Sequence, residues 1–286
     1  MAKDYSWAVP VMRAGYAGRG VTYGAIAGLS LWAIWRGGEA QGTGSALRTL
    51  GTEGWGIVVL CLIAIGLLCY AVWRGIDAAE DLEDYGNEAK GKVARAGMIV
   101  TGLTHGAIAA LALSIVLGQD DGGPGGEGGG QGQGGVASIV GRVLEWPGGR
   151  WIVGIAALCT IGAGVYYLVK GFKAKYREHL RANHFTENYD WALRLGVMAN
   201  GVLIVIIGGF LGAAAASDSE SQAGGLGAAF DWLASQPFGN VLVVTVCIGL
   251  LAFAFFCFVN AAYRIVPKAS DPGVRTLGAK LKAAAS

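Results

Sequence analysis

His105 is the residue whose type and position could most directly do chemistry. It lies in the stretch 96–118, which contains no Lys, Arg, Asp or Glu, and it follows Arg95 by ten residues. A helix rises about 1.5 Å per residue, so a membrane-spanning helix here would place His105 near mid-membrane. An imidazole at that depth could ligate haem, carry a proton or make a polar contact with a partner. No second histidine or chain of carboxylates has a comparable depth, which favours a hydrogen-bonded packing role.

The other groups capable of chemistry form no recognisable catalytic or metal-binding pattern. His179 and His184 lie close to Glu178 and Glu187 in a polar segment, but their spacing is not diagnostic of a zinc site. A nucleophile elbow, an H-E-x-x-H sequence, a Walker sequence and paired intramembrane carboxylates are all missing from the sequence. We therefore predict no enzyme activity and no metal site. The cysteines lack C-x-x-C spacing and are expected to be buried free thiols: Cys61, Cys69, Cys159, Cys247 and Cys257.

The composition is typical of an integral membrane protein. Apolar residues make up 53% of the chain, charged residues only 15%, and the mean hydropathy is +0.48. Most of the uncharged stretches are long enough to cross a hydrocarbon core of roughly 30 Å as helices. The first is the shortest, and we expect it to begin earlier, with Arg13 and Arg19 reaching to the headgroups. The six stretches are 20–35, 56–73, 96–118, 151–169, 195–217 and 238–263.

An internal repeat arranges these stretches as three tandem pairs. Each copy opens with R-x-G-x4-G, beginning at Arg13, Arg95 and Arg194. Tyr23 in the first copy occupies the position of His105 in the second. The sequence therefore predicts an all-α membrane protein of six transmembrane helices. Its units are repeat 1 over 1–92, repeat 2 over 93–190, repeat 3 over 191–266 and a cytoplasmic tail over 267–286.

The positive charges predict the orientation of the chain. All but four of the 22 lysines and arginines fall on one side of the six stretches, and the exceptions are Arg36, Arg48, Arg142 and Arg150. Lys and Arg favour the cytoplasmic side, so we expect both termini in the cytoplasm. A net charge of only +2 argues against nucleic acid as a partner.

On the outer side, each pair of stretches is joined by a segment that predicts a short amphipathic helix at the membrane surface. The pattern is clear over 136–144 and 226–233 and weaker over 46–50. The glycine-rich segment in the outer loop 118–135 is expected to be flexible. It lacks the G-K-[ST] ending of a phosphate-binding loop.

Small residues recur every four positions along the opening stretch of each repeat. Such faces let helix backbones approach closely in a bilayer. We expect the three opening helices to pack around a pseudo-threefold axis, with the closing helices outside. A pore lined by glycine backbone is the alternative. The glycines concerned are Gly20, Gly24, Gly28, Gly102, Gly106, Gly201 and Gly209.

Opposite charges stand at equivalent positions near the cytoplasmic ends of two closing stretches. Asp77 matches Lys173, and Asp81 matches Arg177. These residues could pair and so fix which repeats are neighbours, although exposed pairs contribute only about 0–1 kcal/mol each. The alternative is two solvated helix ends.

The repeat motifs resemble those of a bacterial membrane-protein family known as domain of unknown function 1206. The family pattern of the opening helix, R-x-G-x3-R-G-x2-Y, is similar to Arg13–Tyr23, and that of the closing helix, G-L-x2-Y-x2-W-R, is similar to Gly66–Arg74. The third copy departs most, with Asn200, Ile204 and Cys257 at motif positions. The resemblance covers nearly the whole chain and implies the fold, while the family name carries no activity.

Three functions from different classes remain open at this point. The preferred one is a non-enzymatic protein of the bacterial inner membrane. It would act by helix packing, as an accessory or stabilising subunit against another membrane protein, a larger complex or specific lipids. The second is a small channel or transporter along the pseudo-threefold axis. The third is a haem-binding redox protein that uses His105. The polar lining of the channel would be Thr22, Tyr23, Thr101, Thr104, His105 and Asn200.

Overall fold

The computed structural model describes residues 5–119, 134–269 and 276–284, and within these ranges the regular elements are helices apart from two isolated β-bridges. Six helices are long: α1 (Ala8–Trp35), α3 (Gly56–Glu80), α4 (Ala89–Val116), α6 (Gly149–Phe172), α8 (Asp190–Ser217) and α10 (Gly239–Tyr263). The short α-helices are α2 (Thr43–Thr52), α5 (Gly134–Leu144), α7 (His184–Asn188), α9 (Leu226–Ala234) and α11 (Leu277–Ala284). Single 3₁₀ turns are η1 (Lys175–His179), η2 (Glu220–Gln222) and η3 (Pro267–Ala269).

Five helices, α3, α4, α6, α8 and α10, are long and apolar enough to cross a membrane. This confirms a multi-pass helical membrane protein. Helix α1 is 28 residues long but falls short of the same hydropathy, because Arg13, Arg19 and several glycines interrupt its apolar sequence. Six spans are therefore not confirmed.

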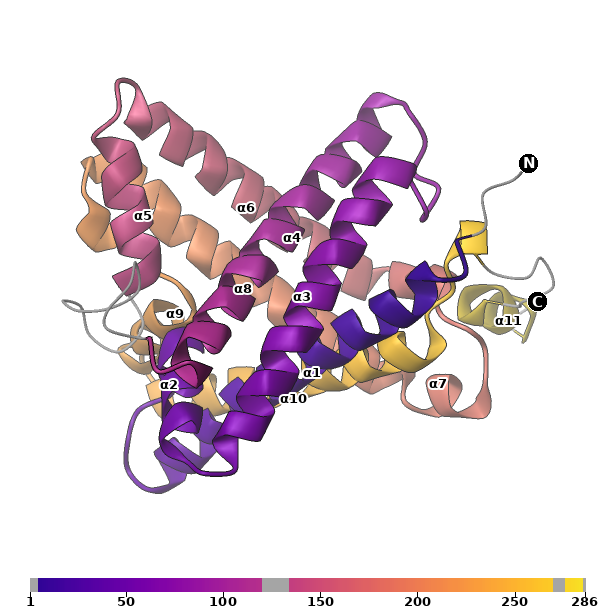
Figure 1. Ribbon diagram of the computed structural model, residues 1–286, viewed down its shortest axis with the longest axis horizontal. Helices are drawn as coiled ribbons and strands as arrows, with labels where there is room; N and C mark the ends of the chain where they lie inside the picture. Colours follow the sequence, from indigo (N-terminus) through magenta and orange to yellow (C-terminus); the bar gives the residue numbers. More distant parts are fainter. Residues whose placement is uncertain (1–4, 120–133, 270–275, 285–286) are drawn as a thin grey trace.

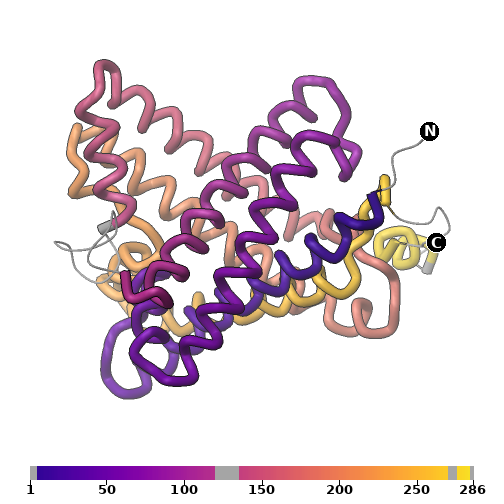
Figure 2. Tube along the Cα trace, viewed as in Figure 1, coloured from indigo at the N-terminus to yellow at the C-terminus, as the bar shows by residue number. Residues whose placement is uncertain are grey.

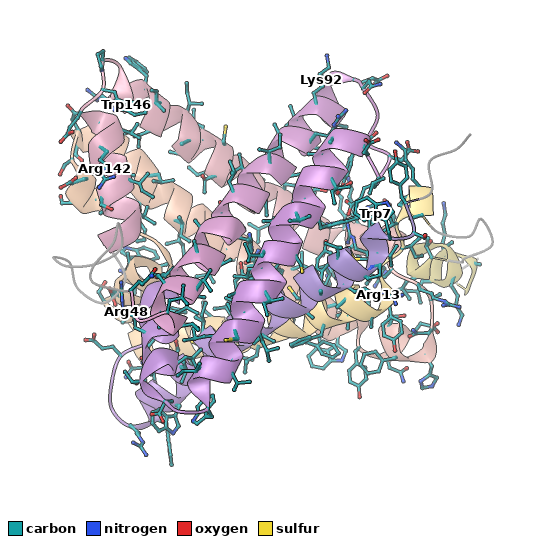
Figure 3. The ribbon with its side chains drawn as sticks, viewed as in Figure 1. Trp7, Arg13, Arg48, Lys92, Arg142 and Trp146 are labelled. Atoms are coloured by element: carbon teal, nitrogen blue, oxygen red, sulfur yellow. The ribbon has the colours of Figure 1, made fainter. Side chains whose placement is uncertain are left out.

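The molecule has two distinct ends. The short helices α2, α5 and α9 lie toward one end, whereas both termini, α7 and α11 lie toward the other (Figure 1). Arg48, Arg142 and Trp146 lie on the side of the first end, and Arg13 and Lys92 on the side of the second (Figure 3). The three predicted outer segments are thus helical and gather at one end. Most of the predicted glycine-rich loop, 120–133, lies outside the described residues.

The long helices pack in the order α4, α3, α1, α10, α8, α6. Extensive contacts join each neighbour in this order, and the α3–α4 and α6–α8 pairs run at a steep angle to each other (Figure 2). In the described part of the chain, α1, α4 and α8 make no extensive contacts with one another, nor does α4 with α6. The expected central trio of opening helices is therefore wrong, because each opening helix packs on closing helices instead.

Helices α1 and α3 cross in close backbone contact. A Cβ atom added to Gly18 would lie only 2.5 Å from the Cα of Gly66, and one added to Gly15 would lie 2.6 Å from the Cα of Tyr70. At the Gly18–Gly66 contact neither residue can carry a side chain, so glycine is required there for the two backbones to touch. The crossing brings Tyr70 beside the middle of α1.

Five of the predicted glycines lie where the structure brings two helices together. Gly20 and Gly24 face Phe258 and Ala254 of α10, Gly102 and Gly106 face α3, and Gly201 faces Leu168 of α6. Gly28 and Gly209 do not serve packing within the chain, since no heavy atom lies within 4 Å of an added Cβ. Each is eight residues beyond a packed glycine, and at about 100° per residue it is rotated by roughly 80° off the contact face.

The α1–α3 crossing can be tested with a matched pair of glycine substitutions. Gly18→Val should lower the free energy of unfolding by about 1–3 kcal/mol, because the new side chain collides with α3 backbone. Gly28→Val, in the same helix but with open space around it, should change stability little. Thermal unfolding in detergent measures both, and equal effects would contradict the proposed crossing.

Candidate functional site

Arg19 is buried inside the helix bundle instead of reaching the headgroups. Its side chain is 4% exposed, and the guanidinium lies over the rings of Tyr70, Phe253 and Tyr23 at 4.7, 5.3 and 5.7 Å. Its Nη1 donates to the Tyr70 hydroxyl at 2.9 Å. The snorkelling prediction is therefore wrong for Arg19. Arg13 is six residues earlier, on a different face of α1, and is exposed.

Tyr70 joins Arg19 to a second arginine. Its hydroxyl accepts from Arg19 Nη1 and also from Arg74 Nε at 3.0 Å. Arg74 Nη2 donates to the Tyr16 hydroxyl at 3.1 Å, and its Nη1 donates to Asp77 Oδ2 at 3.0 Å. The Tyr16 and Tyr70 rings meet edge to face at 5.4 Å. Each nitrogen of the Arg74 guanidinium thus donates one hydrogen bond to an acceptor within the bundle.

Two carboxylates complete the arrangement. Glu83 lies beyond the end of α3 and pairs with Arg264, the residue that follows α10. The two residues are 181 positions apart in the sequence. Arg264 Nη1 also donates to Asn260 Oδ1 at 2.8 Å, and the backbone N–H of Glu83 donates to Asp77 Oδ1 at 3.1 Å. We call Arg19, Tyr70, Arg74, Asp77, Glu83 and Arg264 the guanidinium network. It connects the first repeat to the end of the third.

The charge states of Glu83 and Arg264 are set by their ion pairing more than by burial. Burial raises the pKa of Glu83, but the nearby Arg264 and Arg74 guanidinium groups outweigh it and hold that pKa well below its usual value. Burial also lowers the pKa of Arg264, yet its attraction to Glu83 raises the pKa above the ordinary value. Both groups therefore remain charged at neutral pH, which makes them structural anchors and poor proton carriers.

His105 lies against the network without joining its hydrogen bonds. Its ring is 4.8 Å from the Tyr70 ring, and Nδ1 is 2.8 Å from the Thr101 carbonyl oxygen. A carbonyl can only accept, so Nδ1 carries the hydrogen. Within the described residues no group of three or more His, Cys, Asp or Glu side chains could hold a metal ion. The geometry gives His105 a packing and hydrogen-bonding place on α4.

The other repeat-motif residues have two different placements. Tyr23 lies beside Arg19 and meets Phe253 edge to face at 4.9 Å. Arg95 donates to the carbonyls of Ala78 and Ala79 at 2.5 and 3.0 Å, and Arg194 donates to that of Phe172 at 2.9 Å. Arg95 and Arg194 therefore both bind the C-terminal end of the preceding closing helix, where cations interact favourably with the helix dipole.

The predicted charge pairs between repeats do not form. Asp77 binds Arg74, while Asp81 accepts from the backbone N–H groups of Tyr85 and Gly86 and lies 4.0 Å from Lys268. Arg177 pairs with Asp190, and Lys173 is exposed. The reason is local. Helix α3 ends at Glu80, and Asp81 turns to φ 52°, so Asp77 and Asp81 do not lie along one continuous helix that could face the second repeat.

Comparison with known proteins identifies the family. The model of the family Domain of Unknown Function (DUF1206) matches three segments, 14–81, 96–174 and 195–264. The chain belongs to this family. The uncharacterized protein YxxB of Bacillus subtilis (strain 168) is 25% identical over 262 residues, which cover 90% of this chain and 92% of the relative. No solved structure is significantly similar.

Each DUF1206 segment covers one pair of long helices, α1 with α3, α4 with α6 and α8 with α10. The guanidinium network uses equivalent positions of these segments unequally. Tyr70 and Arg74 come from the closing helix of the first segment, whereas their counterparts in the second, Tyr166 and Lys170, face each other in a cation–π contact at 5.9 Å. The three DUF1206 repeats thus share a helical frame but differ in their polar contacts.

The sequence did not indicate the pairing of Glu83 with Arg264, nor the hydrogen bonds that the chain around Arg264 makes with the other repeats. Ile265 N–H donates to the His179 carbonyl at 2.9 Å, Leu277 N–H donates to that of Leu180 at 2.7 Å, and Lys268 Nζ donates to that of Glu80 at 3.1 Å. The segment that follows α10 therefore packs against the linkers of repeats 1 and 2. No short motif indicates these contacts, since the partners are far apart in the sequence.

The Glu83–Arg264 pair can be tested by removing one charge and then both. Glu83→Gln should destabilise the protein by about 3–5 kcal/mol, because it leaves the Arg264 guanidinium buried without its carboxylate. Adding Arg264→Met should restore a substantial part of the loss. Denaturant unfolding of the single and double variants gives the coupling, and additive losses would show that the pair is not formed.

The lowered pKa of His179 leads us to expect that the stability of the folded protein depends on pH. Burial, followed by the positive charge of Arg264, lowers its pKa from 6.5 to about 4. The unfolded chain therefore binds more protons than the folded protein between these values, and stability falls as pH falls from about 6.5 to 4. His179→Gln should flatten this part of the pH profile of the unfolding midpoint. The Glu83 contribution is lost only at lower pH, below about 4.3.

Proposed function

We propose that this protein is a non-enzymatic bacterial inner-membrane protein that acts by helix packing, as an accessory or stabilising subunit of a larger membrane assembly. In this proposal α1 is a sixth span and both termini are cytoplasmic. Support for the orientation comes from the sequence, in which all but four of the 22 lysines and arginines fall on one side of the six apolar stretches.

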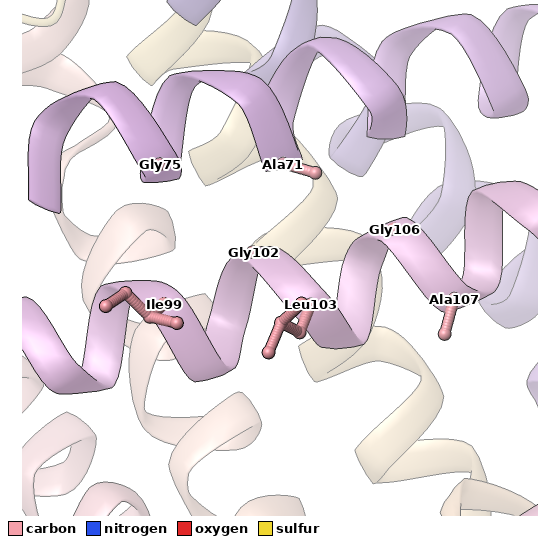
Figure 4. A pocket seen from close by; sticks show the side chains of 7 residues that line it. All are labelled: Ala71, Gly75, Ile99, Gly102, Leu103, Gly106 and Ala107. Carbon is pink, nitrogen blue, oxygen red and sulfur yellow. The ribbon is translucent and has the colours of Figure 1, made fainter. Parts of the chain in front are cut away.

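The observation that carries the proposal is an apolar groove between α3 and α4. It has a volume of about 350 Å³ and is shown in Figure 4. Small residues dominate its surface, and an added Cβ at Gly75 would meet no heavy atom within 4 Å. The groove is lined by Ala71, Gly75, Ile99, Gly102, Leu103, Gly106 and Ala107.

In this proposal a helix of another membrane protein occupies the groove. Between lipid-immersed helices the hydrophobic effect gives little attraction, so close packing against small residues supplies the binding energy. Helices α4 and α6 stand at the two ends of the packing order and are the least buried of the five apolar helices. The free side of α4, beside the groove, is therefore where an added helix can continue the row.

The channel alternative has less support from the positions of its proposed lining residues. The hydroxyls of Thr22, Thr101 and Thr104 donate to carbonyls of their own helices at 2.7–2.9 Å, and Thr104 is exposed on the outer surface of α4. These groups do not converge on a common path. The haem alternative rests on His105 alone. This side chain is enclosed beside Tyr70, and its Nδ1 is hydrogen-bonded to the Thr101 carbonyl.

The groove can be tested with two glycines that both have room for a side chain. Gly75 lines the groove, whereas Gly162 is an exposed glycine of α6 with no heavy atom within 4 Å of an added Cβ. Gly75→Leu should release the partner by filling the groove, and Gly162→Leu should leave the complex intact. Neither substitution should unfold the chain.

The measurement is purification from native membranes in mild detergent, followed by blue-native electrophoresis and mass spectrometry of co-migrating proteins. A stoichiometric membrane partner that disappears only with Gly75→Leu supports the proposal. A wild-type chain that migrates alone contradicts it, and ion flux in proteoliposomes or a Soret band would then favour the channel or the haem protein.

A further inference from the structure

A pocket of mixed character lies at the end of the molecule that carries α2, α5 and α9 (Figure 1). It has a volume of about 200 Å³ and is formed by α8, the turn η2 and α9. It shares no lining residue with the apolar groove between α3 and α4. Phe210 and Trp232 supply aromatic side chains to it, and Ser221, Gln222 and Asp231 supply polar ones.

The sequence between η2 and α9 shapes the pocket. A Cβ added to Gly224 would lie 2.3 Å from the Cβ of Ala228 and 3.3 Å from the ring of Phe210, so glycine is needed for the chain to pass this close. Ala228 is buried, whereas Asp231 and Trp232 are exposed. The inner wall of the pocket is therefore closely packed, and its carboxylate and indole are accessible from outside.

The carboxylate of Asp231 has no partner within the described residues, where it makes neither a hydrogen bond nor an ion pair. Its pKa is raised above the ordinary value, first by partial burial and second by the negative charge of Glu39. Both effects disfavour the charged carboxylate, and a cation beside Asp231 would oppose them. The surroundings of Asp231 therefore favour a positively charged ligand.

The other polar groups of the pocket have free acceptor capacity. The side-chain amide of Gln222 makes no hydrogen bond in the described part of the chain. Ser221 Oγ shares one hydrogen bond with Ser219 Oγ at 2.8 Å, which leaves at least one of its lone pairs unused. Carboxylate, hydroxyl and amide oxygens accept from N–H groups, and aromatic faces attract cations. The pocket thus suits a cation that carries N–H donors.

We propose that this pocket binds a primary alkylammonium group, of the kind carried by ethanolamine in solution or by an ethanolamine phospholipid headgroup. Asp231 pairs with the ammonium, Ser221 Oγ and Gln222 Oε1 accept its N–H groups, and the aromatic side chains contact the adjoining carbon atoms. A site beside the surface helix α9 is open to both sources. The proposal does not depend on the partner groove, since the two places share no residue.

The first experiment titrates the purified full chain, in deuterated detergent near neutral pH, with ethanolamine in exchange for sodium at constant chloride. Saturation-transfer difference NMR of the methylene protons reports binding. We expect saturable binding of ethanolamine and roughly tenfold or more weaker binding of choline, because a quaternary nitrogen has no N–H to donate. Equal binding of choline would overturn the assignment to a primary ammonium.

A second arm distinguishes the two sources. The thermal unfolding midpoint is measured in vesicles of phosphatidylglycerol alone and in vesicles that also contain phosphatidylethanolamine. A midpoint that phosphatidylethanolamine raises in the wild type but not in Asp231→Asn assigns the site to the lipid. Saturable binding of ethanolamine without this effect assigns it to a free amine.

Variants of two exposed carboxylates at the same end make the result specific. Asp231→Asn should abolish the binding of ethanolamine, and it leaves the buried core unchanged because Asp231 is exposed. Glu53→Gln, just beyond α2, removes a carboxylate outside the pocket and should bind ethanolamine like the wild type. Absence of an effect in both arms, or binding that persists unchanged in Asp231→Asn, would overturn the proposal.

Discussion

A guanidinium group that is largely shielded from water must find its partners inside the protein, and three such groups organise this bundle. Arg74 and Arg264 form ion pairs with the carboxylates of Asp77 and Glu83. Arg19 has no carboxylate partner. It donates to the Tyr70 hydroxyl and lies over aromatic rings. Leaving any of these charges unpaired costs several kcal/mol, so the helices that carry them are held in one arrangement. The network therefore acts as the junction between the first repeat and the end of the third.

The packing order of the helices follows from this junction. Helices α1, α3 and α10 supply or directly precede the network residues and occupy the middle of the row, where Gly15 and Gly18 let α3 approach α1 closely. Helices α4 and α6 are attached outside this centre through α3 and α8 and keep open apolar faces. A rigid polar centre with two uncovered outer helices suits a protein whose surface receives another helix. The same arrangement explains why the repeats, though similar in sequence, are not equivalent in their contacts.

The sequence predicted local features well and long-range features poorly. The three pairs of long helices and the three short helices between them follow from local periodicity and the internal repeat, and the structure has helices at these places. The face of each helix is harder to assign. Arg13 and Arg19 belong to the same motif, yet the helical twist turns one outward and the other inward. The Glu83–Arg264 pair spans 181 positions, and no pattern of neighbouring residues could reveal it.

The accessibility of the Arg19 guanidinium tests the central claim most directly. Arginine Nε–H groups can be followed by nitrogen-15 NMR of the labelled protein in micelles, with assignments from single Arg→Lys variants. The account predicts that the Nε–H groups of Arg19, Arg74 and Arg264 exchange with water far more slowly than that of exposed Arg13. Exchange of Arg19 as fast as that of Arg13 would mean that its side chain reaches the membrane surface, which would contradict the account.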